Sequence, residues 1–477
     1  MREATAYIRA KMEAAGLGTA AIRAFLYQYE KLAHSEAGLI SEDSIAPVQS
    51  LPSIEGQPLA GEIGDLAART VVLKLNGGLG TSMGLEKAKS LLTVRDDLTF
   101  LDVIVRQCLR LRSEVSRSLA LIFMNSFSTS ADTATALQKY PALGEPKTLE
   151  LMQNKVPKID VKSLLPVDWP DNPAHEWCPP GHGDIYSSLL GSGLLDRLLG
   201  ERKEYLFVSN SDNLGATLDL SILAFFANSS TPFLMEVTRR TAMDQKGGHL
   251  ARRKSDGRLL LRESAQCRHA DLDAFQNIDL HRYFNTNTLW IRLDALRAEL
   301  DRGQGLLPLP LIRNEKTVDP RNKATPKVYQ LETAMGAAIG CFEGAAAIEV
   351  PRNRFAPVKT TADLLAVRSD AYELDPEFRL VLRAGRKGVP PLVKLDDRYK
   401  LVDQLEDLIV HGVPSLARCR SLTIEGNVQF QSGVEIVGDV KFVNQDETRK
   451  EIPAGVYEDE DVSFLNRAAK APGSGRA

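Results

Sequence analysis

The sequence predicts an α/β protein with a parallel or mixed main sheet, followed by a small left-handed β-helix. Short apolar runs alternate with helical stretches from residue 71 to about 350, which is typical of α/β domains. A glycine-rich turn follows the first of these runs, at a position where open α/β sheets bind ligands. Apolar residues then recur every six positions near the C-terminus, which indicates a coiled parallel structure.

The N-terminal segment, predicted over residues 1–66, combines helices with a linker. Residues 1–35 carry apolar side chains at helical spacing, interrupted at residues 16–18 (Gly-Leu-Gly). We expect two amphipathic helices that pack on the body of the protein. Residues 41–62 are rich in Pro, Ser and Gly, and we expect them to form a connecting loop.

The main domain is predicted over residues 67–352. Helices are expected at residues 100–112 and 218–228. Because ligands of open α/β sheets bind beyond the carboxyl ends of the strands, we expect functional residues in the loops that follow the strands. The predicted strands are residues 71–75, 119–124, 205–209, 233–238 and 288–291.

The glycine turn is the first candidate site. Residues 71–92 read VVLKLNGGLGTSMGLEKAKSLL, a strand followed by glycines and then by Lys87 and Lys89. Glycines let backbone N–H groups approach a phosphate or a base, and lysine supplies a mobile cation. The spacing is not that of a P-loop, because Gly84 precedes Leu-Glu, nor that of a dinucleotide fingerprint, because Met83 occupies the third glycine position. A plain glycine turn beside a basic surface is the alternative.

Four further segments carry polar candidates. Asp212 follows a predicted strand, where a carboxylate beside a triphosphate would suit Mg²⁺, although it could instead cap the next helix. His182 lies between two glycines, and Asp184 after it could be another helix cap. The asparagines of residues 284–288 suit hydroxyl recognition. Residues 350–361 hold two arginines and a lysine, a basic run that is ordinarily a solvated surface.

The C-terminal domain is predicted over residues 353–477, with the β-helix at about 420–445. A meandering antiparallel sheet would not keep the six-residue register. The coils are too few to be stable alone, so we expect them to pack on the core or on a partner subunit of a homo-oligomer. We expect the tail from Lys470 to be disordered. The repeated apolar residues are Leu422, Val428, Val434 and Val440, and Ile424, Phe430, Ile436 and Phe442.

The composition is that of an ordinary globular protein. Of the 477 residues, 43% are hydrophobic and 25% are charged, and the formal net charge is −3, which argues against nucleic-acid or membrane partners. The five cysteines are widely separated and show no metal-ligand spacing. With no signal-like N-terminus, these features predict a cytoplasmic protein with reduced thiols.

Together, the segments resemble the eukaryotic-type UTP–glucose-1-phosphate uridylyltransferase (UDP-glucose pyrophosphorylase) family. The resemblance spans residues 65 to 445 and at least six motifs, including LNGGLGTSMG, PPGHGDIY and QLETAMG. The sequence departs from the family at residues 85–88, where a Gly-Pro is usual, and at Thr288, where an asparagine is usual. The resemblance implies a nucleotidyltransferase fold, Rossmann-like with a mixed sheet. It also implies Mg²⁺-dependent, reversible transfer of a uridylyl group from UTP to glucose 1-phosphate.

The resemblance also implies residue roles. Lys89, Asp212 and Lys359 would be catalytic, and Asp212 would bind the metal. Gln153 would read the uracil edge, with Gly181 close to uracil. The implied substrate-binding residues are Leu75, Asn76, Gly77, Gly78, Gln153, Gly181, His182, Asn210, Ser211, Asp212, Gly248, Glu263, Asn285, Asn287 and Lys359.

Two alternatives stay open. The first is the same chemistry on another sugar 1-phosphate, such as that of galactose or N-acetylglucosamine. The glycine turn favours glucose, because the N-acetylglucosamine enzymes usually carry an arginine near Ser82. The second is a catalytically silent UDP-sugar-binding protein, against which the presence of all three implied catalytic residues argues.

Overall fold

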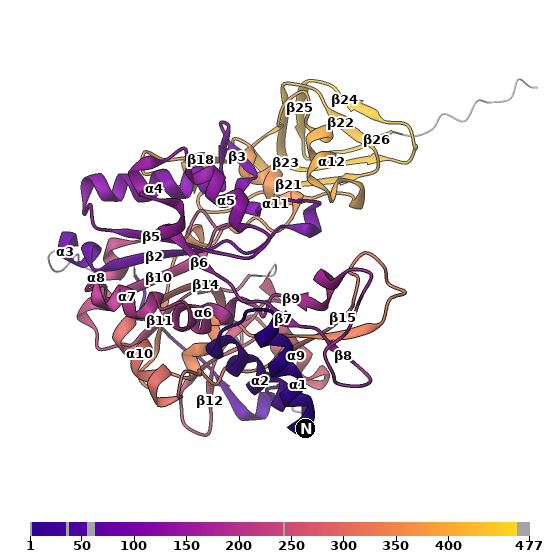
Figure 1. The fold of residues 1–477 in the computed structure, drawn as a ribbon. Helices are drawn as coiled ribbons and strands as arrows, with labels where there is room; N and C mark the ends of the chain where they lie inside the picture. Colours follow the sequence, from indigo (N-terminus) through magenta and orange to yellow (C-terminus); the bar gives the residue numbers. More distant parts are fainter. Residues whose placement is uncertain (1, 35–37, 55–62, 242–243, 465–477) are drawn as a thin grey trace, which may run out of the picture. The chain divides into compact units, whose positions relative to one another are not determined.

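The computed structural model describes residues 2–34, 38–54, 63–241 and 244–464 (Figure 1). Their contacts form two compact units, neither of which is continuous in sequence. The first unit contains residues 1–78, 105–211 and 216–355, and the second contains residues 79–104, 212–215 and 356–477. The predicted domain boundaries at residues 66 and 352 stay a prediction.

A mixed sheet of ten strands forms the centre of the first unit. Its strands are β1 (Ile45–Pro47), β2 (Thr70–Leu75), β5 (Ala120–Asn125), β6 (Glu150–Met152), β10 (Tyr205–Asn210), β11 (Phe233–Arg239), β12 (His249–Arg253), β13 (Leu259–Arg262), β14 (Tyr283–Arg292) and β17 (Ala346–Glu349). The main path runs β1-β12-β14-β10-β2-β5-β6, with β11, β13 and β17 paired off this path. Figure 1 shows β5, β2, β10 and β14 side by side. All five predicted strands are therefore confirmed.

Strand direction corrects one expectation. β2 pairs in parallel with β10 and β5, but β14 is antiparallel to β10, with Arg292 opposite Tyr205. The residues before the predicted strand 288–291 therefore lie at the edge where β2 and β10 end, and the loop after it lies at the opposite edge. The expectation that functional residues lie in the loop after residues 288–291 was therefore wrong. The rule that ligands bind beyond the carboxyl ends holds for strands that run in parallel.

Helices of the first unit pack on both faces of this sheet. On β10, Leu206 and Val208 join the core that α6, α7 and α10 complete, whereas Phe207 on the other face packs against Trp290, 4.6 Å between ring centroids. Phe226 of α8 lies next to that pair. The helices are α3 (Ile63–Ala68), α4 (Phe100–Glu114, which belongs to the first unit from residue 105), α5 (Ser130–Leu137), α6 (Ile185–Gly191), α7 (Leu194–Gly200), α8 (Leu220–Asn228), α9 (Leu272–Gln276) and α10 (Leu293–Arg302).

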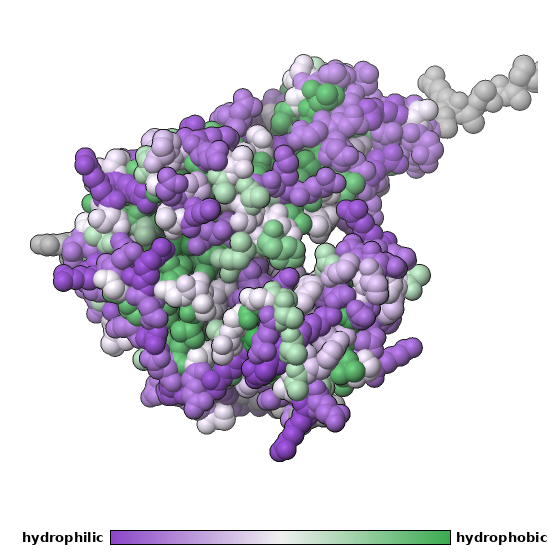
Figure 2. Space-filling view, viewed as in Figure 1, coloured by the Kyte–Doolittle hydropathy of each residue, from purple (hydrophilic) through white to green (hydrophobic). Residues whose placement is uncertain are grey.

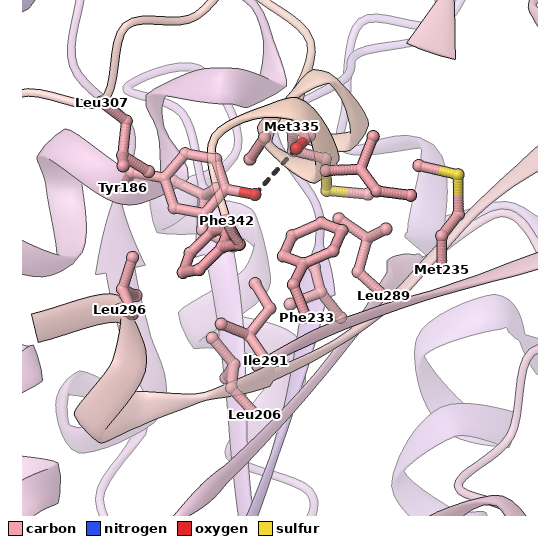
Figure 3. Packing of buried hydrophobic residues seen from close by; sticks show 14 of the residues in the cluster. Tyr186, Leu206, Phe233, Met235, Leu289, Ile291, Leu296, Leu307, Met335 and Phe342 are labelled. Carbon is pink, nitrogen blue, oxygen red and sulfur yellow. Dashed lines mark hydrogen bonds between the residues drawn. The ribbon is translucent and has the colours of Figure 1, made fainter. Parts of the chain in front are cut away.

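The core reaches the 3₁₀ helix η11 (Met335–Gly340). The Tyr186 hydroxyl of α6 donates to the Met335 carbonyl at 2.7 Å. Figure 3 shows this bond above a packed group that includes Phe233 and Phe342. Because both partners of the bond are buried, the start of η11 is fixed to the core.

The N-terminal helices are confirmed as α1 (Arg2–Ala14) and α2 (Thr19–Ala33). Their apolar faces pack against a smaller cluster of the first unit that includes Val156 and Ile159. The loop predicted for residues 41–62 is wrong at β1, which pairs antiparallel with β12 because Ile45 can be buried there. Residues 55–62 lie outside the described part. The short strands nearby are β7 (Val156–Pro157), β8 (Ile159–Asp160), β9 (Trp177–Cys178), β15 (Ile312–Thr317) and β16 (Lys327–Glu332).

Parallel strands form the C-terminal part of the second unit. They are β20 (Leu392–Lys394), β21 (Ser415–Glu425), β22 (Val428–Phe430), β23 (Val434–Asn444), β24 (Lys450–Ile452), β25 (Gly455–Glu458) and β26 (Asp461–Phe464). In β21 and β23, Leu422 pairs with Val440 and Ile424 with Phe442, and all eight repeat residues are buried. The parallel pairing excludes the meandering sheet, and the strands extend beyond residues 420–445. The left-handed coil stays a prediction, and the tail from Lys470 lies outside the described part.

These strands are anchored to the preceding segment of the same unit. The Tyr399 hydroxyl donates to the Val428 carbonyl at 2.8 Å and accepts the Val428 N–H at 2.7 Å. The Asp370 carboxylate accepts the N–H groups of Leu416 and Ala417 at 2.8 and 3.0 Å. The other elements of this unit are α11 (Thr361–Arg368), α12 (Val402–Leu408), β3 (Thr93–Arg95), β4 (Leu98–Thr99), β18 (Tyr372–Leu374) and β19 (Leu380–Leu382).

One face of the molecule is of mixed polarity. On the face shown in Figure 2, hydrophobic residues are interspersed with hydrophilic ones. Within the described ranges, no helix combines the length and the apolar character needed to cross a membrane. All five cysteines fall in these ranges as free thiols.

Candidate active site

The glycine turn after β2 is attached to the neighbouring strand β5. The buried Asn76 donates from Nδ2 to Asn125 Oδ1 at 2.8 Å and to Thr133 Oγ1 at 2.9 Å, and its N–H donates to the Met124 carbonyl at 2.8 Å. Asn76 therefore holds the start of the turn in place. On the side of β2 that faces β10, the Ser211 N–H donates to the Leu75 carbonyl at 3.1 Å.

A glutamine cluster forms beside this turn and consists of Gly77, Gln153, Gly181 and His182. Gln153 follows β6, its N–H donates to the Asn125 carbonyl at 2.7 Å, and its Nε2 donates to the Gly181 carbonyl at 3.0 Å. A Cβ at Gly77 would lie 2.7 Å from Gln153 Oε1. Only glycine leaves space for the Gln153 amide at that position.

The PPGHG segment is shaped by close contact with Thr333. Gly181 has φ +79°, and a Cβ there would lie 2.5 Å from the Thr333 carbonyl oxygen. His182 Nδ1 accepts the Met335 N–H at 2.9 Å. That bond leaves the ring proton on Nε2, so the imidazole is neutral and can donate from Nε2.

An asparagine cluster forms at the start of β14 and consists of Gly248, Glu263, Asn285 and Asn287. The register between β11 and β14 shifts at Glu236, which leaves Thr286 and Asn287 in a bulge. Asn287 has φ +56°, a conformation that asparagine tolerates better than most residues. Its Oδ1 accepts from Asn285 Nδ2 at 2.9 Å, and its N–H donates to Asn285 Oδ1 at 3.0 Å.

Glu263 lies against Gly248 in this cluster. A Cβ at Gly248 would be 2.5 Å from Glu263 Oε2, so glycine is required for this approach. Burial raises the pKa of Glu263, against the opposing effect of a hydrogen bond with Asn285. The Asn285 N–H donates to the Gly248 carbonyl at 3.2 Å, which closes the cluster.

The 3₁₀ helix η11 touches both clusters. Met335 at its start bonds to His182, and a Cβ at Gly336 would lie 3.3 Å from Asn285 Nδ2. The QLETAMG motif therefore supports both groups of polar side chains from one element.

A lysine–aspartate cluster forms in the second unit and consists of Lys89, Asp212 and Lys359. Asp212 Oδ2 accepts from both lysine Nζ atoms at 2.8 Å, and Lys89 also donates to the Val358 carbonyl. The side chains of Asp212 and Lys89 are 10% and 12% exposed, but that of Lys359 is 56% exposed. Burial alone would raise the pKa of Asp212, but Lys359 and Lys89 lower it below the ordinary value, so the carboxylate is anionic at neutral pH.

Backbone pairing positions the Asp212 loop within its unit. The Asp212 carbonyl accepts the Val358 N–H at 3.1 Å, and Asn213 Oδ1 accepts the Ala356 N–H at 3.0 Å. Asp219, not Asp212, caps the following helix α8, since it accepts the N–H of Ser221 at 2.8 Å. The helix-cap alternative for Asp212 is therefore wrong.

The remaining predicted residues lie outside the three clusters. A Cβ at Gly78 would meet no atom within 4 Å, so this glycine faces open space. Asn210 ends β10 and is half-buried. Arg352 and Arg354 form ion pairs with Asp244 and Glu236, with shortest N···O distances of 2.7 and 2.8 Å.

Lys74 and Glu236 are buried charged residues of the sheet that the sequence analysis did not single out. Lys74 of β2 donates to Ser209 Oγ and to the Ala216 carbonyl, both at 2.7 Å, and burial lowers its pKa to about 7. Glu236 of β11 accepts from Arg354 and from the Trp290 indole at 2.9 Å. The available signal was a charged residue in the interior of each largely apolar strand.

Comparisons with known proteins agree on one group. A family model described as UTP–glucose-1-phosphate uridylyltransferase matches residues 21–437. The enzyme of that name from Saccharomyces cerevisiae is 42% identical over 389 residues, covering 81% of this chain and 76% of the relative. The one from Hordeum vulgare is 41% identical over 400 residues, covering 83% and 82%.

Solved structures give the same result. A point mutant of Leishmania major UDP-glucose pyrophosphorylase, in complex with UDP-glucose, superposes with a TM-score of 0.93 at 49% identity, covering 97% of this chain and 100% of that chain. A structure described as UDP-glucose phosphorylase from Trypanosoma brucei gives a TM-score of 0.91 at 48% identity, with the same coverage.

Proposed function

The chain belongs to the UTP–glucose-1-phosphate uridylyltransferase family, and on that premise we propose that it transfers a uridylyl group from UTP to glucose 1-phosphate. The products are UDP-glucose and pyrophosphate, and the reaction is reversible. The observation that carries the proposal is the lysine–aspartate cluster, which places two lysine ammonium groups on one buried carboxylate.

The glutamine cluster is the proposed uracil site. Because Gln153 Nε2 already donates to the Gly181 carbonyl, Oε1 is the atom left to accept the N3–H of uracil. Cytosine carries no hydrogen at N3 and would leave Oε1 unpaired, at a cost of about 1–3 kcal/mol. This difference supports UTP as the nucleotide.

The asparagine cluster is the proposed sugar site. Asn285, Asn287 and Glu263 offer amide and carboxylate groups that recognise hydroxyls by directional hydrogen bonds. His182 Nε2 is the proposed donor to the sugar phosphate. Glucose 1-phosphate is the proposed acceptor, and galactose 1-phosphate and N-acetylglucosamine 1-phosphate are its competitors.

The chemistry needs no general base. An oxygen of the sugar phosphate attacks the α-phosphorus of UTP, the bond from that phosphorus to pyrophosphate breaks, and the attacking oxygen is already anionic. We assign Lys89 and Lys359 to the phosphates, where their charge reduces repulsion between two anions and stabilises the transition state. The exposed Lys359 is free to turn from Asp212 to a bound phosphate.

Asp212 is the proposed Mg²⁺ ligand. Its Oδ1 is buried and has no hydrogen-bond partner in the described structure, so a hard cation would satisfy this atom. The described residues contain no group of three or more His, Cys, Asp or Glu residues that could hold a metal ion. Phosphate oxygens and water would therefore complete the coordination, and the bound ion would neutralise phosphate charge.

Pyrophosphate release from UTP with Mg²⁺ and each of the three sugar 1-phosphates tests the reaction. We expect glucose 1-phosphate to give the highest kcat/KM. Binding of UDP-glucose without any release would instead support the silent binding protein. The cytoplasmic location and a homo-oligomer through the C-terminal strands stay predictions.

Two lysine variants test the residue roles. Lys89→Met should lower kcat about 10²- to 10³-fold while raising the KM for UTP by less than about fivefold, because its charge acts mainly in the transition state. Lys359→Met should raise the KM and lower the kcat together. Equal losses of kcat and UTP affinity in Lys89→Met would contradict its transition-state role.

A further inference from the structure

Asp184 is a buried carboxylate whose hydrogen-bond donors are all neutral. It is 6% exposed. Its Oδ2 accepts the Asn154 N–H at 2.7 Å and the Ser188 hydroxyl at 2.8 Å, and its Oδ1 accepts Asn154 Nδ2 at 3.0 Å and the Ser187 hydroxyl at 2.5 Å. It does not cap α6, because its side chain accepts no backbone N–H of that helix.

A carboxylate accepts from all of these donors together. Two ionised oxygens offer about four acceptor positions, whereas an asparagine at position 184 would offer one oxygen and would place an NH₂ group against other donors. Burial raises the pKa of Asp184, and the hydrogen bonds from Ser187 and Asn154 oppose that rise. Burying a charged carboxylate costs free energy, and a role in packing alone would not require a charge at this position.

The backbone around Gln153 is held by two hydrogen bonds, and Asp184 accepts one of them. The Gln153 N–H is bonded to the Asn125 carbonyl at 2.7 Å, and the next N–H, that of Asn154, is bonded to Asp184. The Asp184 N–H donates to the Gly181 carbonyl at 3.3 Å, the same oxygen that accepts Gln153 Nε2 at 3.0 Å. Asp184 thus holds the residue after Gln153 through its carboxylate, and through its backbone N–H it contacts the acceptor that orients the Gln153 amide.

We propose that Asp184 is a positioning residue that sets the preference for uracil over cytosine by fixing the orientation of the Gln153 amide through Asn154 and Gly181. This inference rests on the proposed uracil site. If the hydrogen bonds of Asp184 are weakened, the Gln153 amide can turn and present its NH₂ group to the base. An NH₂ group can donate to N3 of cytosine.

The test compares Asp184→Asn with the exchanged pair Asp184→Asn/Asn154→Asp. In the pair, a carboxylate at 154 accepts from the amide at 184, whose oxygen can still accept the N–H of residue 154. Initial rates with UTP and with CTP are measured at saturating glucose 1-phosphate. We expect Asp184→Asn to lower the ratio of kcat/KM for UTP over CTP at least tenfold, mainly through the KM for UTP, and the exchanged pair to recover most of that ratio.

Asp102→Asn is the matched control, because Asp102 is also a buried carboxylate, 4% exposed, that accepts from Thr99. It should lower thermal stability without changing the UTP/CTP ratio. An unchanged ratio in a folded Asp184→Asn protein would overturn the proposal. A fall in kcat together with an equal rise in KM for both UTP and CTP would also overturn it, because those changes indicate a purely structural role.

Nucleotide binding can test the role of Asp184 even if the proposed reaction is wrong. If the wild-type protein releases no pyrophosphate with any sugar phosphate, the proposed reaction fails. Equilibrium binding of UTP and CTP to the same variants then measures the selectivity directly. Loss of the UTP preference in Asp184→Asn would support its positioning role, and a preserved preference would refute it.

Discussion

Replacing Gly77 with alanine isolates the contact between the glycine turn and the Gln153 amide. The added Cβ would lie 2.7 Å from Gln153 Oε1 and 3.6 Å from Ser126. Gly77 is not among the glycines with a positive φ, so alanine can adopt its backbone conformation. The substitution therefore changes the space available to one amide oxygen.

The expected effect follows from that distance. Ordinary contact begins near 3.4 Å, so the Gln153 oxygen must retreat by about 0.7 Å. A comparable shift of Nε2 would break its 3.0 Å bond to the Gly181 carbonyl. Losing that bond and misplacing the acceptor for uracil should together cost about 1–2 kcal/mol, or roughly 5- to 30-fold in the KM for UTP. The kcat should change less than about threefold, because the phosphate groups are untouched.

Steady-state kinetics with varied UTP, together with thermal unfolding, measure this prediction. Gly200→Ala, at the end of α7, is the control, because its Cβ would meet no atom within 4 Å and it should show wild-type kinetics. Gly78→Ala is informative beside it, because its Cβ also meets no protein atom, so any loss of UTP affinity would reflect contact with the nucleotide. An unchanged KM for UTP in a folded Gly77→Ala protein would refute the assignment of Gln153 to uracil.

Three further predictions concern stability. Burial lowers the pKa of Lys74 from 10.5 to about 7. The unfolded chain therefore binds more protons than the folded chain between those pH values. In denaturant titrations from pH 7 to 10, the free energy of unfolding of the wild type should gain up to about 4 kcal/mol relative to that of Lys74→Met. An equal pH dependence in the two proteins would contradict this. Asp212→Asn should cost roughly 3 kcal/mol at pH 7. Since the folded pKa of Asp212 is lowered, that difference should begin to shrink as the pH falls below 3.8 and vanish once the pH is below the folded pKa. A constant difference would exclude the ion pairs as its cause. Thr288→Val removes a buried hydroxyl without a partner in the described structure and should raise stability by about 1 kcal/mol, whereas Thr288→Ser should not.

The sequence predicted those elements whose signal is local. β2 and β10 are apolar runs buried on both faces, so composition alone identified them. The six-residue repeat correctly predicted that its residues in β21 and β23 are buried, because the two parallel strands repeat the same local pattern. Among candidate site residues, Lys89, Asp212 and Lys359 do come together, although the motifs that contain them lie more than 100 residues apart.

The features that were missed depend on pairing between distant segments. The bulge that exposes Asn287 exists only because β14 changes register against β11, some 50 residues earlier in the chain. The antiparallel direction of β14 is likewise a property of the assembled sheet. Lys74 and Glu236 were not identified from the sequence, because their partners come from other strands and loops. β1 is three residues long and is defined by its pairing with β12.

The discontinuous composition of the second unit has a consequence for biosynthesis. Residues 79–104 and 212–215 belong with a segment that begins only at residue 356. At 5 to 20 residues per second, the ribosome needs on the order of 10 to 50 s to progress from residue 104 to residue 356. During that time Arg95 lacks the Val367 and Ser369 carbonyls that it later binds, and Asp212 lacks one of its two lysines. Translation of the last quarter of the chain is therefore the step that completes the environment of Lys89 and Asp212, and nascent chains stalled before it would be targets for chaperones.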